Sequence, residues 1–190
     1  DKPIPPSPII SCLGRIQDVK KAITMSFKRE NSSIILIGKR KNELGGSIFY
    51  DLHNELGKNV PTPDLNEVKN QIYGITDCIE RSLVFACHDI SEGGVAASLC
   101  EMAFGNSIGC SVNIESELST EKILFSETGG FILEAKNENI ESIHSIFNQY
   151  KLEAYAIGIT GGNKIKLNNA INITVDDAKK SWENGLRNKL

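Results

Sequence analysis

The sequence predicts an α/β domain of the α+β kind, in which helices pack on a mixed β-sheet. Its 190 residues, 40% of them apolar, suit one sizeable core and argue against two independent domains. Short runs rich in β-branched residues alternate with segments whose apolar residues recur every three or four positions. Several strand-like runs lie only a few residues apart, so the sheet should be mixed rather than wholly parallel.

Two strands and a helix are predicted first along the chain. Residues 9–16 and 33–37 are β-branched runs bounded by glycines, as strands buried on at least one face are. Residues 45–57 predict a helix that a glycine ends, because apolar residues recur there at every fourth position. These apolar residues are Ile48, Leu52 and Leu56.

The next helix has the clearest pattern in the chain. Thr62 is suited to cap it, and Pro63 is suited to its first turn. Five apolar residues lie on one stripe at helical spacing, which predicts the buried face. This stripe consists of Leu65, Val68, Ile72, Ile75 and Ile79.

A strand, a turn and a helix follow. Residues 83–87 predict a buried strand, and the glycine pair at 93–94 begins a helix. The apolar face of this helix consists of Val95, Leu99 and Met102. Further strands are predicted at residues 110–114 and 131–135.

The last third of the chain predicts two helices and two strands. Residues 140–147 have a helical stripe, and residues 154–159 form a strand. Residues 161–163 (Gly-Gly-Asn) are suited to turn a hairpin into a strand at 164–167. A final helix from about Val175 carries acidic residues in its first turn and basic residues near its end, as the helix dipole favours. These are Asp176 and Asp177, then Arg187 and Lys189, and its buried stripe is Val175, Ala178, Trp182 and Leu186.

Composition excludes several classes of function. The net charge of −3 and pI near 5.7 give no reason to expect a nucleic-acid partner. The only dense basic run, residues 39–41, is interpreted as a solvated loop. No run of about 18 apolar residues predicts a membrane span, and no leader for secretion opens the chain.

The ends of the chain and its cysteines suggest its context. Residues 1–8 contain four prolines and are interpreted as an interdomain linker, with residues 9–190 as a single domain. The absence of an initiator Met suggests a fragment of a longer protein. Five cysteines without a Cys-x-x-Cys pair argue against a disulfide framework and a zinc site, and favour reduced thiols in the cytoplasm.

The first candidate site is the turn at residues 88–94, between a strand and a helix. Gly93 and Gly94 would let backbone approach a ligand, and the free N–H groups of a helix start attract anions. Asp89 would be an acceptor or a magnesium ligand beside them. The alternative is that Ser91 and Glu92 only cap the helix while the glycines allow tight packing.

Two weaker candidates also contain glycine pairs. Ser126 and Glu127 precede a strand, where a carboxylate binds a hydroxyl or a metal, or else its own backbone. Gly45 and Gly46 begin the predicted helix at 45–57, where close packing is as good an explanation as ligand contact. A catalytic pair of Cys87 with its neighbour His88 is disfavoured, because adjacent strand residues point to opposite faces.

These segments together resemble the family of phosphoribosylformylglycinamidine synthase, at its second C-terminal-type domain. The resemblance rests on the segments 42–47 (Asn-Glu-Leu-Gly-Gly-Ser), 88–94 (His-Asp-Ile-Ser-Glu-Gly-Gly), 101–103 (Glu-Met-Ala) and 124–127 (Leu-Phe-Ser-Glu). Further agreement extends from the proline-rich start to the Trp182 helix. Several motifs in order across the chain are more specific than any one of them.

The resemblance implies a reaction and its partners. The family converts formylglycinamide ribonucleotide, ATP and glutamine-derived ammonia into formylglycinamidine ribonucleotide, with magnesium, in purine biosynthesis. ATP is thought to phosphorylate the amide oxygen before ammonia attacks. The implied partners are the remaining domains of the synthase chain, a glutaminase and small accessory subunits, in the cytoplasm.

The resemblance also implies a limited role for this domain. The family's first C-terminal-type copy places a magnesium-binding Asp and substrate contacts at positions that match Asp89 and residues 126–127. This sequence departs from that copy at three positions, which are His88, Glu92 and Thr128. The departures fit the second copy, a pseudo-active site that in larger relatives holds an auxiliary nucleotide, ATP or ADP. Asp89 and Glu127 are therefore expected to bind rather than to catalyse.

Two alternatives remain open. The domain could be a purely structural scaffold. It could also belong to a relative with the same architecture, such as aminoimidazole ribonucleotide synthetase, selenophosphate synthetase, thiamine-monophosphate kinase or a hydrogenase maturation factor; the turn at residues 88–94 argues against these.

Overall fold

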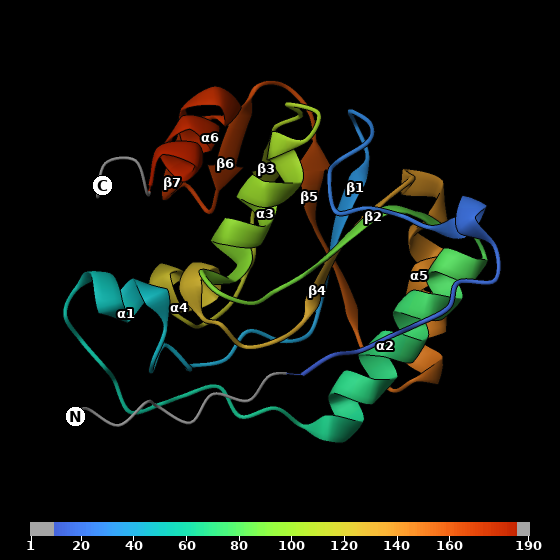
Figure 1. The fold of residues 1–190 in the computed structure, drawn as a ribbon, viewed down its shortest axis with the longest axis horizontal. Coiled ribbons are helices and arrows are strands. Elements are labelled where there is room, and N and C mark those ends of the chain that lie inside the picture. The colour runs from blue at the N-terminus through green and yellow to red at the C-terminus, as the bar shows by residue number, and fades with distance from the viewer. Residues whose placement is uncertain (1–9, 186–190) are drawn as a thin grey trace.

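A seven-stranded mixed sheet is the centre of the fold (Figure 1). The structure, a computed structural model, describes residues 10–185. The strand order is β2-β4-β1-β5-β3-β6-β7, and all neighbours are antiparallel except β3 and β6. The predicted mixed α/β fold is thus confirmed. The strands are β1 (Ser33–Ile37), β2 (Val84–Asp89), β3 (Cys110–Val112), β4 (Phe131–Ala135), β5 (Ala154–Thr160), β6 (Lys164–Leu167) and β7 (Ile171–Thr174).

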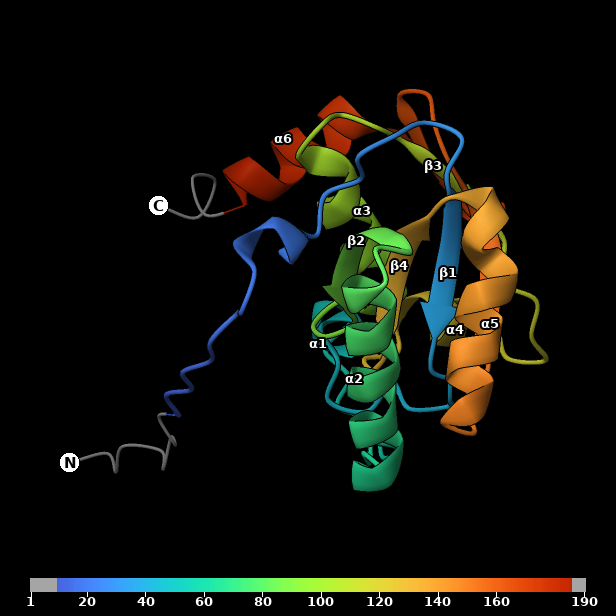
Figure 2. The same ribbon diagram turned by 90° about the vertical axis from the view of Figure 1, so that its right-hand side faces the viewer.

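Helices cover both faces of this sheet, as Figures 1 and 2 show. They are α1 (Ile48–Leu52), α2 (Leu65–Glu80), α3 (Gly94–Phe104), α4 (Thr120–Phe125), α5 (Ile140–Gln149) and α6 (Val175–Asn184), with 3₁₀ turns at η1 (Val19–Lys21) and η2 (Asn137–Asn139). Within β1, Ile34 and Leu36 face the core under α3, whereas Ile35 and Ile37 face the core under α2 and α5. This alternation explains why all five residues of β1 are buried.

Most predicted strands lie where the sequence places them. β1, β4 and β6 have the predicted bounds. β3 and β5 differ by one or two residues at their C-terminal ends, and β2 begins one residue later and ends two residues later than predicted. The predicted apolar faces of α3 and α5 are also confirmed. Their buried residues include Val95, Leu99, Met102, Ile143 and Phe147.

The predicted strand at residues 9–16 is wrong over residues 10–16, and residue 9 lies outside the described range together with the predicted linker. These residues belong to no strand, and Ile10, Leu13 and Ile16 are 86%, 99% and 66% exposed. Figure 2 shows the segment running away from the body of the domain. β-branched residues favour a strand only where a neighbouring strand supplies backbone partners.

The predicted helix at residues 45–57 is wrong in length and in its buried face. α1 has only five residues, because Asn54 adopts a left-handed φ of 56° just after it. Ile48, Leu52 and Leu56 are 45%, 75% and 78% exposed. Their spacing of four residues therefore does not indicate a helix face that packs on the sheet.

Helix α2 is confirmed, but its cap and its buried face differ from the prediction. Asp64, not Thr62, accepts hydrogen bonds from the first backbone N–H groups. The buried residues are Gln71, Gly74, Ile75 and Cys78. At Gly74 an added Cβ would lie 2.7 Å from the Phe147 ring, so the missing side chain lets α5 approach closely. Of the predicted stripe, Ile75 is buried and Ile79 packs against the core, whereas Leu65 and Ile72 are 79% and 48% exposed.

The predicted hairpin between β5 and β6 is also wrong. β3 lies between them, antiparallel to β5 and parallel to β6. Gly109 donates its N–H to the carbonyl of Gly162, and Gly161 donates to the carbonyl of Gly109. The glycines at 161–162 therefore carry the chain past β3 rather than into a hairpin.

The end of the described chain agrees with the prediction in part. Thr174 caps α6, and Asp176 and Asp177 lie in its first turn as predicted. Trp182 is 64% exposed rather than buried, although its ring lies 5.9 Å from that of Phe104. Leu186, Arg187 and Lys189 lie outside the described residues. No helix within residues 10–185 is long and apolar enough to cross a membrane.

Candidate functional site

The three glycine-containing segments of the sequence meet at one edge of the sheet. We call this site the Glu127 corner and define it as residues 43–47, 88–94 and 126–130. β2 ends there at Asp89, and Ile90 donates its N–H to the carbonyl of Gly130 at 2.8 Å. The corner therefore joins the end of β2 and the start of β4 to the starts of α1 and α3.

Glu127 links the two helix starts. Its Oε1 atom accepts hydrogen bonds from the backbone N–H of Ile48 at 2.9 Å and from that of Gly93 at 3.0 Å. The N-terminus of a helix favours an anion, and here the chain supplies that anion itself. Neither Ser91 nor Glu92 caps α3 with its side chain, since the capping position is Gly93.

The glycines of the corner allow backbone segments to pack closely. A Cβ on Gly94 would lie 2.7 Å from the carbonyl oxygen of Leu124. A Cβ on Gly45 would lie 2.8 Å from the backbone of Asn59. Gly46 has a left-handed φ of 72° and donates its N–H to Leu56. Of the two interpretations, close packing accounts for these glycines without a ligand.

Ser126 belongs to a buried hydrogen-bond network. Its hydroxyl lies 2.7 Å from that of Thr128 and donates to the carbonyl of Glu43 at 3.1 Å. The Thr128 hydroxyl donates to Glu43 Oε2 at 2.8 Å. Because these groups satisfy one another, Ser126 has little capacity left for a ligand.

Arg40 supports the same turn, a role that its position in a basic run of the sequence does not indicate. Its guanidinium donates to the carbonyls of Thr128 at 2.6 Å and Gly129 at 2.8 Å. Burial lowers the pKa of Arg40 to about 10, and the nearby charges of Glu43 and Glu67 oppose this shift. The residue stays charged at neutral pH. The interpretation of residues 39–41 as a solvated loop is thus wrong for Arg40.

Asp89 lies at the rim of the corner. Its side chain is 62% exposed, and its Oδ1 atom lies 3.2 Å from Nδ1 of His88. His88 Nε2 lies 2.7 Å from Glu101 Oε2 on α3. Cys87 packs into the core under α2 and α5. His88 and Cys87 therefore point to opposite faces of the sheet, as predicted. Among residues 10–185, no group of three or more His, Cys, Asp or Glu is placed to hold a metal. Magnesium at Asp89 would need oxygen ligands from elsewhere.

A cavity of about 210 Å³ opens beside the corner. Four carboxylates line it, those of Glu43, Asp64, Glu67 and Glu127, against the single amine of Lys41. The other predicted site residues do not line it; these are Asp89, Ser91, Glu92, Gly93, Gly94, Ser126, Gly45 and Gly46. The acidic lining disfavours a bare phosphate, and the volume is below the usual range for a nucleotide-sized ligand.

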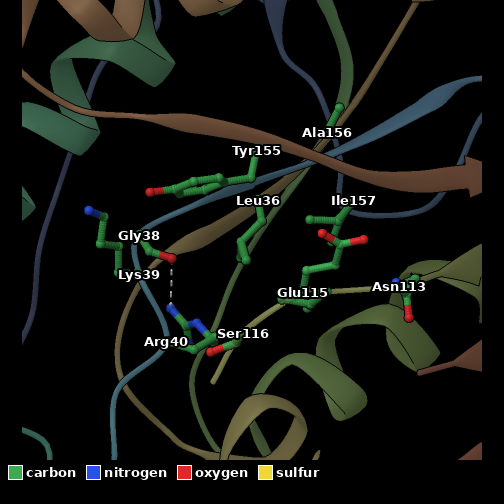
Figure 3. A pocket seen from close by; sticks show the side chains of 11 residues that line it. Leu36, Gly38, Lys39, Arg40, Asn113, Glu115, Ser116, Tyr155, Ala156 and Ile157 are labelled. Atoms are coloured by element: carbon green, nitrogen blue, oxygen red, sulfur yellow. Dashed lines mark hydrogen bonds between the residues drawn. The ribbon is translucent and has the colours of Figure 1, made fainter. Parts of the chain in front are cut away.

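A larger cavity, of about 550 Å³, lies beside the first half of β5 (Figure 3). We call it the β5 cavity and define it by its lining residues. They are Leu36, Gly38, Lys39, Arg40, Asn113, Ile114, Glu115, Ser116, Tyr155, Ala156 and Ile157. None of the predicted site residues lies there.

Comparison with known proteins identifies the class. Residues 29–168 match the family model described as AIR synthase related protein, C-terminal domain. The match covers most of the chain, and the chain belongs to this family.

The curated relatives are more specific. The chain is 32% identical over 194 residues to phosphoribosylformylglycinamidine synthase subunit PurL of Methanothrix thermoacetophila, covering 98% of this chain and 25% of that protein. It is 37% identical over 155 residues to the same subunit of Thermococcus sibiricus, covering 78% and 22%. The chain thus spans about a quarter of the length of the curated relatives it matches.

Solved structures share the fold. Thermotoga maritima PurL complexed with FGAR aligns with a TM-score of 0.71 at 17% identity, covering 84% of this chain and 30% of that one. Thiamine-monophosphate kinase from Stenotrophomonas maltophilia aligns with a TM-score of 0.55 at 15% identity, covering 77% and 53%. At these identities the likeness concerns the fold alone.

Proposed function

We propose that this chain is a C-terminal-type domain of a phosphoribosylformylglycinamidine synthase. The supporting observation is that relatives with this name match nearly the whole chain at 30–34% identity. The parent enzyme would use ATP and glutamine-derived ammonia to convert formylglycinamide ribonucleotide into formylglycinamidine ribonucleotide. It is a ligase of purine biosynthesis, to which this domain contributes a part.

Within that enzyme, we assign the domain a structural role at its own corner. The observation that carries this assignment is the position of Glu127, whose carboxylate already accepts the N–H groups at the starts of α1 and α3. A phosphate would have to displace Glu127 and then face the other carboxylates of the corner cavity. On this account the catalytic groups lie in other parts of the parent chain.

An auxiliary nucleotide site is the second candidate, because one group at the corner is still available. The Asp89 carboxylate is largely exposed and has His88 as its hydrogen-bond partner. It would hold one magnesium ion that also binds the phosphates of ATP or ADP. Relatives crystallised with ATP and with ADP make nucleotides the ligands to test.

The proposal also implies partners and a location. A structure described as PurLQS from Thermotoga maritima shares the fold, which supports contacts with further subunits. We expect these to be a glutaminase and a small accessory subunit, besides the remaining domains of the same chain. The whole assembly would act in the cytoplasm.

Kinetics of the parent enzyme test the proposal. The full-length chain should form formylglycinamidine ribonucleotide from ammonia, ATP and formylglycinamide ribonucleotide. Asp89→Asn and Glu127→Gln should leave kcat within about twofold, because a structural corner makes no contact with the reacting atoms. Absence of the ligase activity would refute the proposed synthase function. A loss of kcat beyond about 100-fold in a folded Glu127→Gln enzyme would refute the structural role alone.

A further inference from the structure

The β5 cavity arises from the way the sheet is paired. β3 pairs with β5 only at residues 158–160, and the chain then leaves the sheet after Val112. Along residues 154–156, β5 keeps β1 as its paired neighbour on one side. On the other side Asn113 still donates its N–H to the carbonyl of Ile157 at 2.9 Å, and residues 113–116 line the cavity from there on. The cavity therefore follows from the topology and not from a loose side chain.

The floor of the β5 cavity is apolar and rigidly held. Leu36, Ile157 and Ile114 are 2%, 6% and 8% exposed, and all three belong to the core under α3. Figure 3 shows the Tyr155 ring along one side, with Arg40 and Ser116 across from it. A flat apolar group would find an aromatic wall and an aliphatic floor there.

Two cations border this floor. Lys39 forms an ion pair with Glu153 at 3.3 Å, but both side chains are more than 60% exposed, so the pair holds the ammonium weakly. Arg40 forms none of the ion pairs found among residues 10–185, but its guanidinium donates to the carbonyls of Thr128 and Gly129, and the charges of Glu43 and Glu67 lie near it. Its Nε atom is buried without any hydrogen-bond partner. The weakly held ammonium of Lys39 is therefore the main group that favours an anionic ligand, and the Arg40 guanidinium adds a second positive charge beside it.

The opposite rim limits the size of that anion. Asn113, Glu115 and Ser116 line it with hydrogen-bonding groups, and Glu115 adds a negative charge. The Glu115 carboxylate can accept hydrogen bonds from the two hydroxyls of a ribose or from the amino group of a base. It also repels a long polyphosphate.

We propose that the β5 cavity binds a ribonucleoside monophosphate. The base lies against Tyr155 and the aliphatic floor, the phosphate lies at Lys39 and Arg40, and the sugar faces Glu115. The volume of about 550 Å³ is within the range of pockets for ligands of this size. The β5 cavity shares only Arg40 with the support of the Glu127 corner. A failure of this proposal would leave the proposed function untouched.

Titration of the ¹⁵N-labelled 190-residue chain with AMP tests the proposal. Without magnesium, the amide signals of Lys39, Glu115 and Tyr155 should shift and saturate. Lys39→Ser should weaken AMP binding about tenfold, because a charge-assisted contact to phosphate is lost. Lys166→Ser, which removes an exposed lysine on β6, is the matched control and should change affinity less than about twofold.

Adenosine and ribose 5-phosphate test the two halves of AMP separately, because the first lacks the phosphate and the second lacks the base. Each should bind more weakly than AMP, since each lacks one of the two contacts. The proposal is overturned by an absence of saturable shifts up to roughly 5 mM AMP. It is equally overturned if the shifts cluster at the Glu127 corner, or if Lys166→Ser weakens binding as much as Lys39→Ser does.

Discussion

At the scale of single residues, Glu127 makes the most consequential contacts of the candidate site. One oxygen of its carboxylate accepts two backbone N–H groups that belong to different helices. Hydrogen bonds to a charged acceptor are stronger than neutral ones, and leaving the two donors without a partner has a cost. Glu127 therefore fixes α1 to the rest of the domain.

Replacing Glu127 should loosen that attachment. Glu127→Ala should lower the free energy of unfolding by about 1–3 kcal/mol, and Glu127→Gln by less, because the amide oxygen still accepts. Urea denaturation measures both variants, and hydrogen exchange at the Ile48 amide reports the local effect. Glu92→Gln is the control, since Glu92 is exposed and should change stability by less than about 0.5 kcal/mol. Equal stability of Glu127→Ala and the native chain would contradict the role.

The cysteines give a second prediction at this scale. Burial raises the pKa of Cys78, Cys87 and Cys110 to about 12 and that of Cys100 to about 11, whereas Cys12 is exposed. At pH 8 the folded chain should react with a thiol reagent at Cys12 only, because the thiolate is the nucleophile. The unfolded chain should react at all five. A second cysteine that reacts as fast as Cys12 in the folded chain would refute this.

The same shifts set the sign of a stability change at high pH. The folded pKa lies above the ordinary value of 9.0, so the folded chain retains protons that the unfolded chain loses. This contribution to stability is complete below about pH 9 and is lost as pH rises toward 12. Unfolding by urea at pH 8 and pH 10.5 should therefore show a lower free energy at the higher pH.

At the scale of elements, the sequence pattern predicts strands well where both faces are buried. In β1 and β4, apolar residues face a core on each side, and both strands have their predicted bounds. The pattern fails where contacts between residues distant in sequence determine which face of an element is buried. The buried face of α2 follows from Gly74, whose role depends on Phe147 in another helix. β7 and α4 are short and were not predicted at all.

Gly74 gives a prediction at this scale. Alanine is the better helix former, yet Gly74→Ala should destabilise the domain by about 1–3 kcal/mol, since its Cβ would overlap the Phe147 ring. Thr76→Ala, on the exposed side of the same helix, is the control and should be neutral or slightly stabilising. Thermal unfolding of both variants measures the difference. A more stable Gly74→Ala chain would show that α2 and α5 are not in close contact.

The candidate site was predicted only in outline. The sequence indicates the three segments of the Glu127 corner, and the structure brings them together. The sequence does not indicate that Glu127 accepts hydrogen bonds from both helix starts, or that Arg40 donates to the carbonyl of Thr128. Both contacts depend on side-chain positions set by the folded sheet. The β5 cavity was not foreseen for the same reason, as it depends on where β3 leaves the sheet.

At the scale of the whole molecule, the domain combines a complete two-sided core with an acidic corner that its own chain closes. The chain belongs to the family of AIR synthase related C-terminal domains, and the closed corner supports the structural role that we propose for it. The segment at residues 10–16 presents apolar side chains outside this core.

Titration of the ¹⁵N-labelled chain with magnesium and ADP tests the closed corner most directly. The amide signals of Ile48 and Gly93 report on the two N–H groups that Glu127 holds. If the corner is structural, these two signals stay unchanged up to roughly 5 mM nucleotide. If they shift together and saturate, ADP displaces Glu127, and the corner is a nucleotide site after all.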